Sequence, residues 1–385
     1  MKIVYVYPQF AHMAGTERIL IDKMNFLSTQ ENMEVYAVTH EQGSHPFAYP
    51  LGSAVNHVDL DVRFYSLYKY NSLKRFFKWQ KYRRLLQERF FQLMDILQPD
   101  IVIATTYHTY ILSLIDACPI HFKKILESHI DKCYIHSNDP FNRWTLTRRL
   151  RSYYDMAYLN HITHKFDLLI ALNQKDANDW STYLKTRVIL NMVHLNDTGR
   201  YSNQESKHVI FVGRYTGQKG ISELFKIWEM IFPNHSDWHL DLYGDGDIDE
   251  IPFSEEQREK INIHVHQSDP DIFSRYLESS IFVLTSIYEP FGLVMPEAMS
   301  CGLPVVAFDC PSGPAQIITD GVDGFLIKDR DINLFANRLC QLIDSPQMRL
   351  MMGNAAIQSS QKYSAERIMP QWIILFNELI TSPCQ

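Results

Sequence analysis

The stretch Ile281–Gly302, IFVLTSIYEPFGLVMPEAMSCG, decides the fold of the second half of this 385-residue chain. Its first four residues are apolar and predict a buried strand. The residues that lead up to Gly302 predict a helix, which the glycine ends. Pro296 is acceptable only in a first helical turn because proline has no backbone N–H, so the helix is predicted to begin between Gly292 and Val294. Strand, turn and helix in this order indicate a unit of a parallel α/β sheet.

The turn and the helix start carry groups that could bind an anion. The first amides of a helix have no partner within it, and together with the helix dipole they attract a diphosphate, which the small Gly292 allows to approach closely. Glu289 lies in the turn and Glu297 early in the helix, so both could reach one ligand and accept paired hydrogen bonds from its hydroxyls. The alternative is that Glu289 caps the helix and Glu297 is a solvated helix residue.

Apolar runs alternate with amphipathic segments along the whole chain. This rhythm predicts two parallel sheets covered by helices, and the polar stretch 196–207 between them has the composition of a linker. We expect domains at residues 1–195 and 196–363, and a helix at 364–385 that crosses the domain junction. The strands expected before the linker are 3–6, 34–38, 101–104, 124–127 and 167–172, and those after it are 208–212, 239–243, 281–284 and 305–308.

Composition narrows the class of protein. The chain is 46% hydrophobic and 13% aromatic, which indicates a globular fold. Its six cysteines form no Cys-x2-Cys pair, so a zinc site or a disulfide framework is not indicated and a reducing cytoplasm is expected. No apolar run reaches about 18 residues, so no membrane-spanning helix is expected. The net charge of −7 hides an asymmetry, because residues 1–195 carry 23 Lys and Arg against 18 Asp and Glu, whereas residues 196–385 carry 14 against 26.

A second glycine-rich loop follows the strand at 208–212. Gly213 and Arg214 open this loop, and Lys219 and Gly220 close it. Arg214 and Lys219 could stabilise negative charge that grows on a departing diphosphate, although such residues in a surface loop are more often merely solvated. Gly244 and Gly246 indicate a tight strand end; the alternative is that the Asp-x-Asp at 245–247 holds Mg²⁺ or Mn²⁺.

These motifs together resemble the family-4 retaining glycosyltransferases, in which Glu-x7-Glu follows a strand and often opens as Glu-Pro-Phe-Gly-Leu. The resemblance is specific between about residues 208 and 327. It implies the GT-B fold, in which two Rossmann-like parallel-sheet α/β domains face a cleft, and a UDP-sugar donor with no metal required. By the same resemblance Glu289 contacts the donor sugar, Glu297 binds the ribose, and Arg214 and Lys219 clamp the phosphates. The implied donor-binding set is completed by Gly213, Gly244, Phe291, Gly292, Leu293 and Val294.

Some positions depart from the family pattern. Gln267 stands where the family has a glycine, and it and Ser268 are the expected base contacts. Ala315 and Gln316 replace the usual Arg-Glu of the loop that follows Pro-Ser-Gly-Pro. In the first half, Gly15 and Thr16 begin a helix at the loop that in the family closes over the donor phosphates. His129 follows a predicted strand and by resemblance contacts the reacting sugar, though a histidine there is often structural.

Basic and aromatic residues are interleaved from Arg63 to Phe91 and again from Arg143 to Tyr154. This composition is typical of a membrane surface, and ordinary amphipathic helices or another polyanion are the alternatives; nucleic-acid binding is not expected because the chain is acidic and lacks a nucleic-acid motif. We therefore expect a peripheral protein on the inner face of the cell membrane. The expected reaction is transfer of a hexose from a UDP-sugar to a hydroxyl of a lipid or lipid-linked glycan. A UDP-sugar epimerase and a non-catalytic nucleotide-sugar-binding protein are the alternatives.

Overall fold

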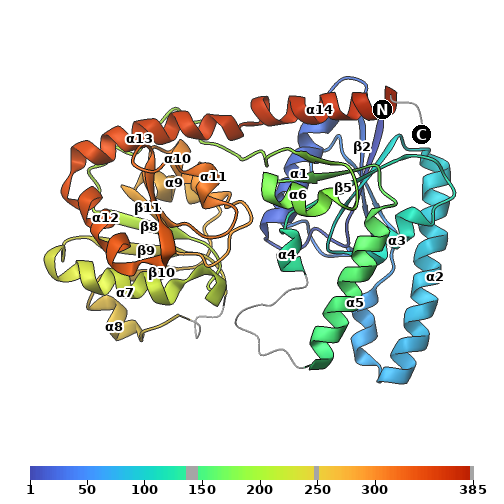
Figure 1. Ribbon diagram of the computed structural model, residues 1–385, viewed down its shortest axis with the longest axis horizontal. Helices are drawn as coiled ribbons and strands as arrows, with labels where there is room; N and C mark the ends of the chain where they lie inside the picture. The colour runs from blue at the N-terminus through green and yellow to red at the C-terminus, as the bar shows by residue number, and fades with distance from the viewer. Residues whose placement is uncertain (136–145, 247–250, 382–385) are drawn as a thin grey trace. The chain divides into compact units, whose positions relative to one another are not determined.

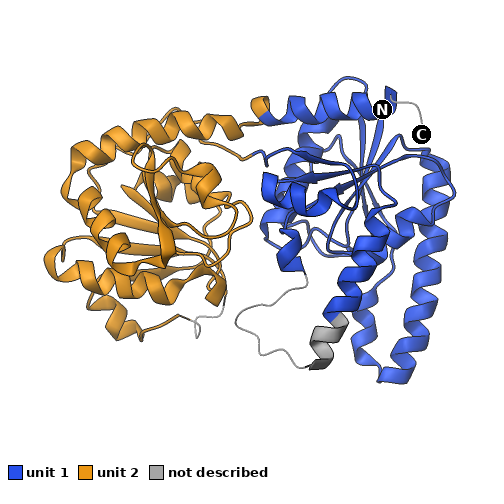
Figure 2. Ribbon diagram, viewed as in Figure 1, with its two compact units in different colours: residues 1–192, 368–385 blue, residues 193–367 orange. Residues whose placement is uncertain are grey.

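The computed structural model describes residues 1–135, 146–246 and 251–381, with residues 146–151 described by their backbone alone. The chain divides into two compact units, residues 1–192 with 368–385, and residues 193–367 (Figure 2). The boundaries predicted from the sequence fall at residues 196 and 364. Each unit contains one sheet, in which every neighbouring pair of strands is parallel.

Unit 1 is built on a seven-stranded sheet of order β3-β2-β1-β4-β5-β6-β7 (Figure 1). Its central strands are buried on both faces, as expected for a parallel sheet covered by helices. The strands are β1 Lys2–Val6, β2 Glu34–Thr39, β3 Asn56–Asp59, β4 Ile101–Thr105, β5 Lys123–Glu127, β6 Leu168–Ala171 and β7 Thr186–Val188. The helices are α1 Gly15–Ser28, α2 Ser72–Leu97, α3 Thr109–Asp116, α4 Lys132–Ile135, α5 Leu146–Thr163 and α6 Gln174–Ser181, with a 3-10 helix at Phe64–Lys69.

Unit 2 contains a six-stranded sheet of order β10-β9-β8-β11-β12-β13. Its strands are β8 His208–Val212, β9 His239–Tyr243, β10 Ile263–His266, β11 Ile281–Leu284, β12 Val305–Phe308 and β13 Gly324–Ile327. Its helices are α7 Ile221–Ile231, α8 Glu255–Glu259, α9 Ile272–Leu277, α10 Val294–Ser300, α11 Pro314–Ile317, α12 Ile332–Asp344 and α13 Pro346–Ser360. Four 3-10 helices at Gly217–Lys219, Phe232–Asn234, Lys328–Arg330 and Gln361–Tyr363 complete the described part of this unit.

The helix α14 spans Ala365–Thr381 and therefore has residues in both units. Its buried residues are Ile368, Met369, Trp372, Leu375 and Phe376, which recur at helical spacing. Within unit 1, Lys23 lies over the Trp372 ring, 4.1 Å from its centroid. No helix among the described residues is both long enough and apolar enough to cross a membrane.

The strand order of unit 2 positions its site. The chain moves from β8 outward to β9 and β10 and then returns to β11 on the other side of β8. The loops that leave β8 and β11 therefore lie side by side at the carboxyl ends of the strands, which is where open α/β sheets bind ligands. These two loops carry Arg214, Lys219 and Glu289 of the predicted donor residues.

Candidate active site

The loop after β11 presents Glu289. All four residues of β11 are buried, so the strand fixes the point from which the loop leaves the sheet. Glu289 is only 8% exposed, and its Oε2 accepts hydrogen bonds from Lys219 Nζ at 2.5 Å and from Ser286 Oγ at 3.2 Å. The structure thus brings together Glu289 and Lys219, which are 70 residues apart in the sequence. A carboxylate held between a cation and a hydroxyl keeps a defined orientation.

The helix α10 begins at Val294, within the predicted range, with Pro296 in its first turn. Gly292 has φ +88°, a backbone conformation that is strained for other residues, so glycine is favoured in this turn. Phe291 is buried, whereas Leu293 and Val294 are half-buried. The turn thus brings the backbone of the predicted diphosphate-binding residues next to Glu289.

Glu297 lies in the first turn of α10 and is almost fully buried, with 1% exposed. Its Oε2 accepts a hydrogen bond from Tyr276 Oη at 3.3 Å. The helix is buried on all sides, so Glu297 is not the solvated helix residue of the alternative reading. A buried carboxylate is retained in a fold only where hydrogen-bond donors or a ligand compensate for the water it has lost.

The loop after β8 approaches its neighbours closely. A Cβ at Gly244 would lie 1.9 Å from the carbonyl oxygen of Gly213, and a Cβ at Gly213 would lie 3.5 Å from Lys219 Cε. These two glycines therefore let the β8 and β9 loops pack together behind Lys219. Arg214 is exposed and has no side-chain hydrogen bond or ion pair with any residue that the structure describes. Its guanidinium is available to an anion.

The predicted base contacts line an open hollow of about 410 Å³. Gln267 and Ser268 form part of its wall, and Ser268 Oγ donates to Asp245 Oδ1 at 2.8 Å. Tyr243 stacks on His266 with ring centroids 4.5 Å apart, at the same hollow. Flat rings and amide groups at an open pocket suit a planar heterocycle.

No group of three or more His, Cys, Asp or Glu side chains among the described residues is arranged to hold a metal ion. Asp247, one carboxylate of the alternative metal motif, lies outside the described residues. Cys310 lies near the Glu289 carboxylate. Burial, together with the negative charge of Glu289, raises the pKa of Cys310 to about 12, so its thiol stays protonated at neutral pH and does not act as a nucleophile.

The remaining predicted residues belong to unit 1. Gly15 begins α1 and is exposed, and Thr16 follows it half-buried. His129 lies two residues beyond β5 and is 6% exposed, and its Nε2 donates to Glu127 Oε2 at 2.9 Å. Glu127 is also paired with the buried Lys23. His129 therefore has a fixed ring orientation.

Several residues of the site were not predicted. Ser286 lies three residues before Glu289, and the polar pair Thr285 and Ser286 after an apolar strand was a signal that could have identified it. Tyr276 contacts Glu297 from 21 residues away, and Gln218 donates to the carbonyl oxygen of Tyr288 at 2.9 Å from 70 residues away. Contacts of this kind leave no local pattern in a sequence, since the strand order alone brings the residues together.

Comparison with known proteins assigns part of the chain to a family. Residues 198–359 match the family model "Glycosyl transferases group 1". Over 96% of its length the chain is 26% identical to an uncharacterized glycosyltransferase of Haemophilus influenzae, of which it covers 98%. Over 54% of its length it is 30% identical to the poly(ribitol-phosphate) alpha-N-acetylglucosaminyltransferase of Staphylococcus aureus, of which it covers 41%.

Solved structures show the fold. Sucrose-phosphate synthase from Thermosynechococcus elongatus superposes with a TM-score of 0.76 and 18% identity, over 99% of this chain and all of the other. A Staphylococcus aureus TarM variant, solved with UDP, fondaparinux and alpha-GlcNAc-glycerol, superposes with a TM-score of 0.73 and 16% identity, covering 98% of this chain and 99% of the other. Anabaena HepE in complex with UDP gives 0.71 and 19%, covering 98% and 100%. Residues 198–359 therefore form a domain that matches the glycosyltransferases of group 1, in a chain with the two-sheet GT-B fold.

Proposed function

We propose that the chain is a retaining glycosyltransferase that moves a hexose from a UDP-sugar to a hydroxyl of a lipid or lipid-linked glycan, forming an α-glycosidic bond. The observation that carries this proposal is the contact of Lys219 with Glu289, which joins the loop after β8 to the turn before α10. A cation, a carboxylate and the start of a helix meet at one sheet edge. These are the groups needed to hold an anionic leaving group beside a polyhydroxylated ligand.

The donor is assigned to these groups by chemistry. Glu289 accepts hydrogen bonds from hydroxyls of the donor sugar, and Glu297 accepts from the ribose. The amides at 292–294 and the side chains of Arg214 and Lys219 bind the diphosphate. Gln267 and Ser268 contact the base at the hollow beside Tyr243. Lys219 exchanges part of its contact with Glu289 for the phosphate, which leaves Ser286 to orient the carboxylate.

The reaction runs on one face of the sugar. As the bond to UDP breaks, negative charge grows on the departing diphosphate, and Arg214 and Lys219 stabilise it more in the transition state than in the ground state. The leaving phosphate oxygen takes the proton of the acceptor hydroxyl as the new bond forms, so the configuration is retained without a covalent intermediate on the protein. The roles that the resemblance implies for His129, Gly15 and Thr16 of unit 1 stay predictions.

Two findings on related proteins support a UDP-sugar donor. The Staphylococcus aureus relative bears the name of an alpha-N-acetylglucosaminyltransferase, and two structures of the same fold contain UDP. Both structures are under 20% identical to this chain, so the donor assignment rests on the site residues themselves.

The Glu297→Ala variant tests the site. We expect it to lose at least about 30-fold in UDP affinity, because the buried carboxylate is the proposed ribose contact. Purified protein is incubated with a panel of UDP- and GDP-sugars, and products are identified by mass spectrometry and NMR. Released sugar or glycoside supports the transferase. An epimerised UDP-sugar indicates the epimerase, and binding without turnover indicates a sensor; an E297A variant that binds UDP and transfers sugar like the parent contradicts the site.

We also propose that the amino-terminal end of α2 lies on an anionic lipid surface. Figure 1 shows this end of the helix projecting away from the sheet of unit 1. The apolar side chains there are exposed rather than packed: Tyr68 is 80% exposed, Leu73 74% and Phe77 68%. Lysines surround them, and Lys69 and Lys78 both lie over the Tyr70 ring. Apolar groups interleaved with cations fit the boundary between lipid headgroups and acyl chains.

The second basic cluster, Arg143 to Tyr154, falls largely outside the described residues. Its last two residues, Tyr153 and Tyr154 on α5, are 71% and 68% exposed. We propose that these two rings also contact the lipid surface.

A vesicle experiment tests the lipid contact. The double variant Phe76→Ser and Phe77→Ser should lose most cosedimentation with vesicles rich in phosphatidylglycerol, while Ile96→Ser should keep it. Ile96 is a matched control because it lies on the same helix at its other end and is 76% exposed. Equal loss in both variants, or binding of the wild type to neutral phosphatidylcholine vesicles alone, contradicts the proposal.

A further inference from the structure

Arg330 touches the predicted donor site from a segment that no donor motif includes. It ends the 3-10 helix Lys328–Arg330 between β13 and α12. Its Nη1 donates to the carbonyl oxygen of Ser286 at 2.8 Å, and its Nη2 donates to that of Thr285 at 3.1 Å. These two carbonyl groups belong to the residues that follow β11, directly before the turn that carries Glu289.

The two residues held by Arg330 are the ones whose hydroxyls hold the ion pair. Thr285 Oγ1 donates to the carbonyl oxygen of Lys219 at 3.0 Å, and Ser286 Oγ donates to Glu289 Oε2 at 3.2 Å. Thr285 and Ser286 are buried, with exposures of 0% and 1%. One guanidinium therefore fixes the backbone from which both members of the Lys219–Glu289 pair are positioned.

Two further contacts hold the guanidinium itself. Glu223 Oε1 accepts from Arg330 Nη2 at 3.0 Å, and the guanidinium carbon lies 4.5 Å from the centroid of the Phe308 ring. The planar fork of arginine satisfies several acceptors at fixed angles while it stacks on a ring, and the single ammonium of lysine does not.

The backbone at Arg330 is strained. Asp329 and Arg330 have φ angles of +54° and +53°, so two consecutive residues other than glycine lie in the left-handed region. Such strain persists only where surrounding contacts impose it, and it concentrates at functional sites. The side chain of Arg330 is held in this segment by Thr285, Ser286, Glu223 and Phe308.

We propose that Arg330 is a positioning residue for Glu289 and Lys219 in the sugar-transfer reaction, an inference that rests on the proposed function. It fixes the geometry of the groups on the sugar and the leaving phosphate. It contributes less to the affinity for UDP, because the proposed ribose contact Glu297 is held by Tyr276, and the proposed base contact Gln267 lines the hollow beside Tyr243. A misplaced catalytic group lowers the rate more than the affinity.

The Arg330→Met variant separates kcat from binding. We expect kcat to fall about 10- to 100-fold while the Kd for UDP changes less than about threefold. Arg330→Lys should recover part of the lost kcat, since one ammonium can serve one of the two carbonyls. If R330M fails to fold, R330K still tests the proposal, because a kcat equal to that of the wild type overturns it.

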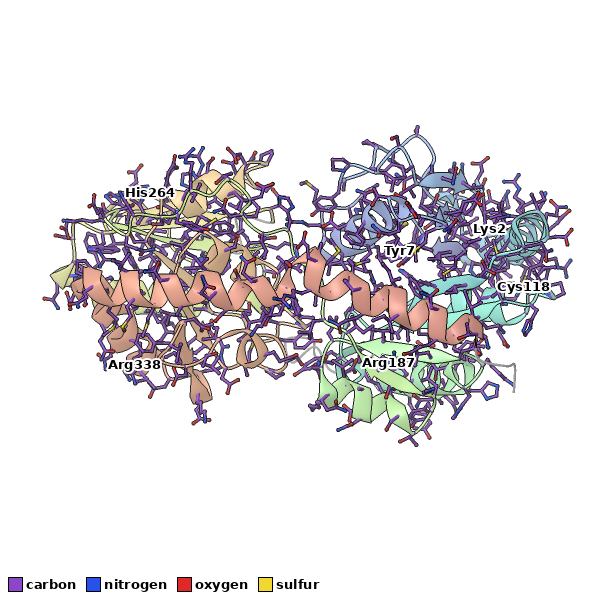
Figure 3. The ribbon with its side chains drawn as sticks, turned by 90° about the horizontal axis from the view of Figure 1, so that it is seen from above. Lys2, Tyr7, Cys118, Arg187, His264 and Arg338 are labelled. Atoms are coloured by element: carbon purple, nitrogen blue, oxygen red, sulfur yellow. The ribbon has the colours of Figure 1, made fainter. Side chains whose placement is uncertain are left out.

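Arg338→Met is the matched control. Arg338 on α12, labelled in Figure 3, also lies over a phenylalanine, 4.8 Å from the Phe325 centroid, and donates to Gln341 Oε1. Among the described residues, its side chain makes no hydrogen bond or ion pair with Lys219, Ser286 or Glu289. A purely structural role for Arg330 predicts equal losses in thermal stability and kcat for the two variants. A kcat of R330M within threefold of that of R338M overturns the proposal.

A crystal structure of R330M distinguishes this inference from the proposed function. If Lys219 Nζ and Ser286 Oγ still contact Glu289 Oε2 in R330M, the inference is wrong, whatever the protein catalyses. If that contact is lost but the wild type transfers no sugar from any donor of the panel, the positioning role stands and the proposed reaction is wrong.

Discussion

Glycine at position 220 is required by its neighbours and by its own backbone. It has φ +66°, and a Cβ there would lie 2.1 Å from the carbonyl oxygen of Thr285, one of the two carbonyls that Arg330 holds. The carbonyl oxygen of Thr285 is part of the backbone, so it cannot move aside as the end of a flexible side chain can. The glycine of this motif thus serves the packing of two loops, which the resemblance to a phosphate-binding loop did not reveal.

Gly220→Ala should lower the free energy of unfolding by about 2 kcal/mol or more, from the left-handed φ and from the displaced carbonyl. Gly217→Ala is the control within the same loop, since a Cβ at Gly217 meets nothing within 4 Å. It should change stability by no more than about 0.5 kcal/mol. Urea unfolding followed by tryptophan fluorescence measures both, and equal effects would show that the Gly220 contact carries no energy.

At the scale of elements, a buried ion pair joins α1 to β5. Lys23 and Glu127 are each 2% exposed, and their side chains contact one another and no bulk water. Burial alone would raise the pKa of Glu127, but the charge of Lys23 and the hydrogen bond from His129 outweigh it and lower that pKa. Each charge is therefore tolerated because the other is present.

Lys23→Met should cost about 3–5 kcal/mol of unfolding free energy, because it leaves the Glu127 carboxylate buried without its cation. The double variant Lys23→Met with Glu127→Gln should lose less than the sum of the two single variants, since it removes both charges. Chemical denaturation measures the free energy of unfolding of the wild type, Lys23→Met, Glu127→Gln and the double variant. Additive losses would mean that the two charges do not depend on one another.

A second pair links β8 to β9 at the surface of unit 2. His208 Nδ1 donates to Asp241 Oδ2 at 2.6 Å, and this bond raises the pKa of His208. Burial opposes ionisation of Asp241, but the bond and the charge of His208 lower its pKa. His239, His264 (Figure 3) and His266 lie in the same row of rings.

The raised pKa of His208 determines how the stability of the fold changes with pH. A raised histidine pKa stabilises the fold below the unfolded value of about 6.5, and this contribution is lost as the pH rises through the folded value. The stability difference between wild type and His208→Gln should therefore be larger at pH 6 than at pH 9. It should not exceed about 1 kcal/mol, because the His208 side chain is 43% exposed and screened by solvent. Unfolding curves at both pH values measure it, and a difference independent of pH contradicts the assignment.

Strands and helices with a clear local sequence pattern could be predicted. Those that form only because they pair with a distant part of the chain could not. The apolar strands β8, β9, β11 and β12 have the predicted bounds, and Pro296 located the start of α10. The edge strand β3, Asn56-His57-Val58-Asp59, has only one apolar residue, and its pairing with β2 rather than its composition makes it a strand. Arg330 escaped prediction for the same reason, since only the packing of β13 against β12 brings it to β11.

At the scale of the whole molecule, the two halves of the chain differ in charge and in proposed task. Residues 1–195 carry five more basic than acidic groups, whereas residues 196–385 carry twelve more acidic ones. An anionic surface therefore attracts the first half and repels the second. The exposed aromatic and basic end of α2 belongs to the attracted half. The proposed nucleotide contacts Glu297, Gln267 and Ser268 all belong to unit 2.

This division predicts how a nucleotide changes thermal unfolding. Each unit has its own sheet and core, so calorimetry should resolve two transitions. UDP at about 100 times its Kd stabilises the unit that binds it by about 2.7 kcal/mol, which corresponds to roughly 5–10 °C for a unit of this size. Since most proposed UDP contacts lie in unit 2, its transition should move by that amount and the other by much less. The transition is assigned by E297A, in which the shift at the same UDP concentration should fall to about a third or less. A single transition, or an equal shift of both, would mean that the two units unfold as one and that nucleotide binding stabilises the whole chain.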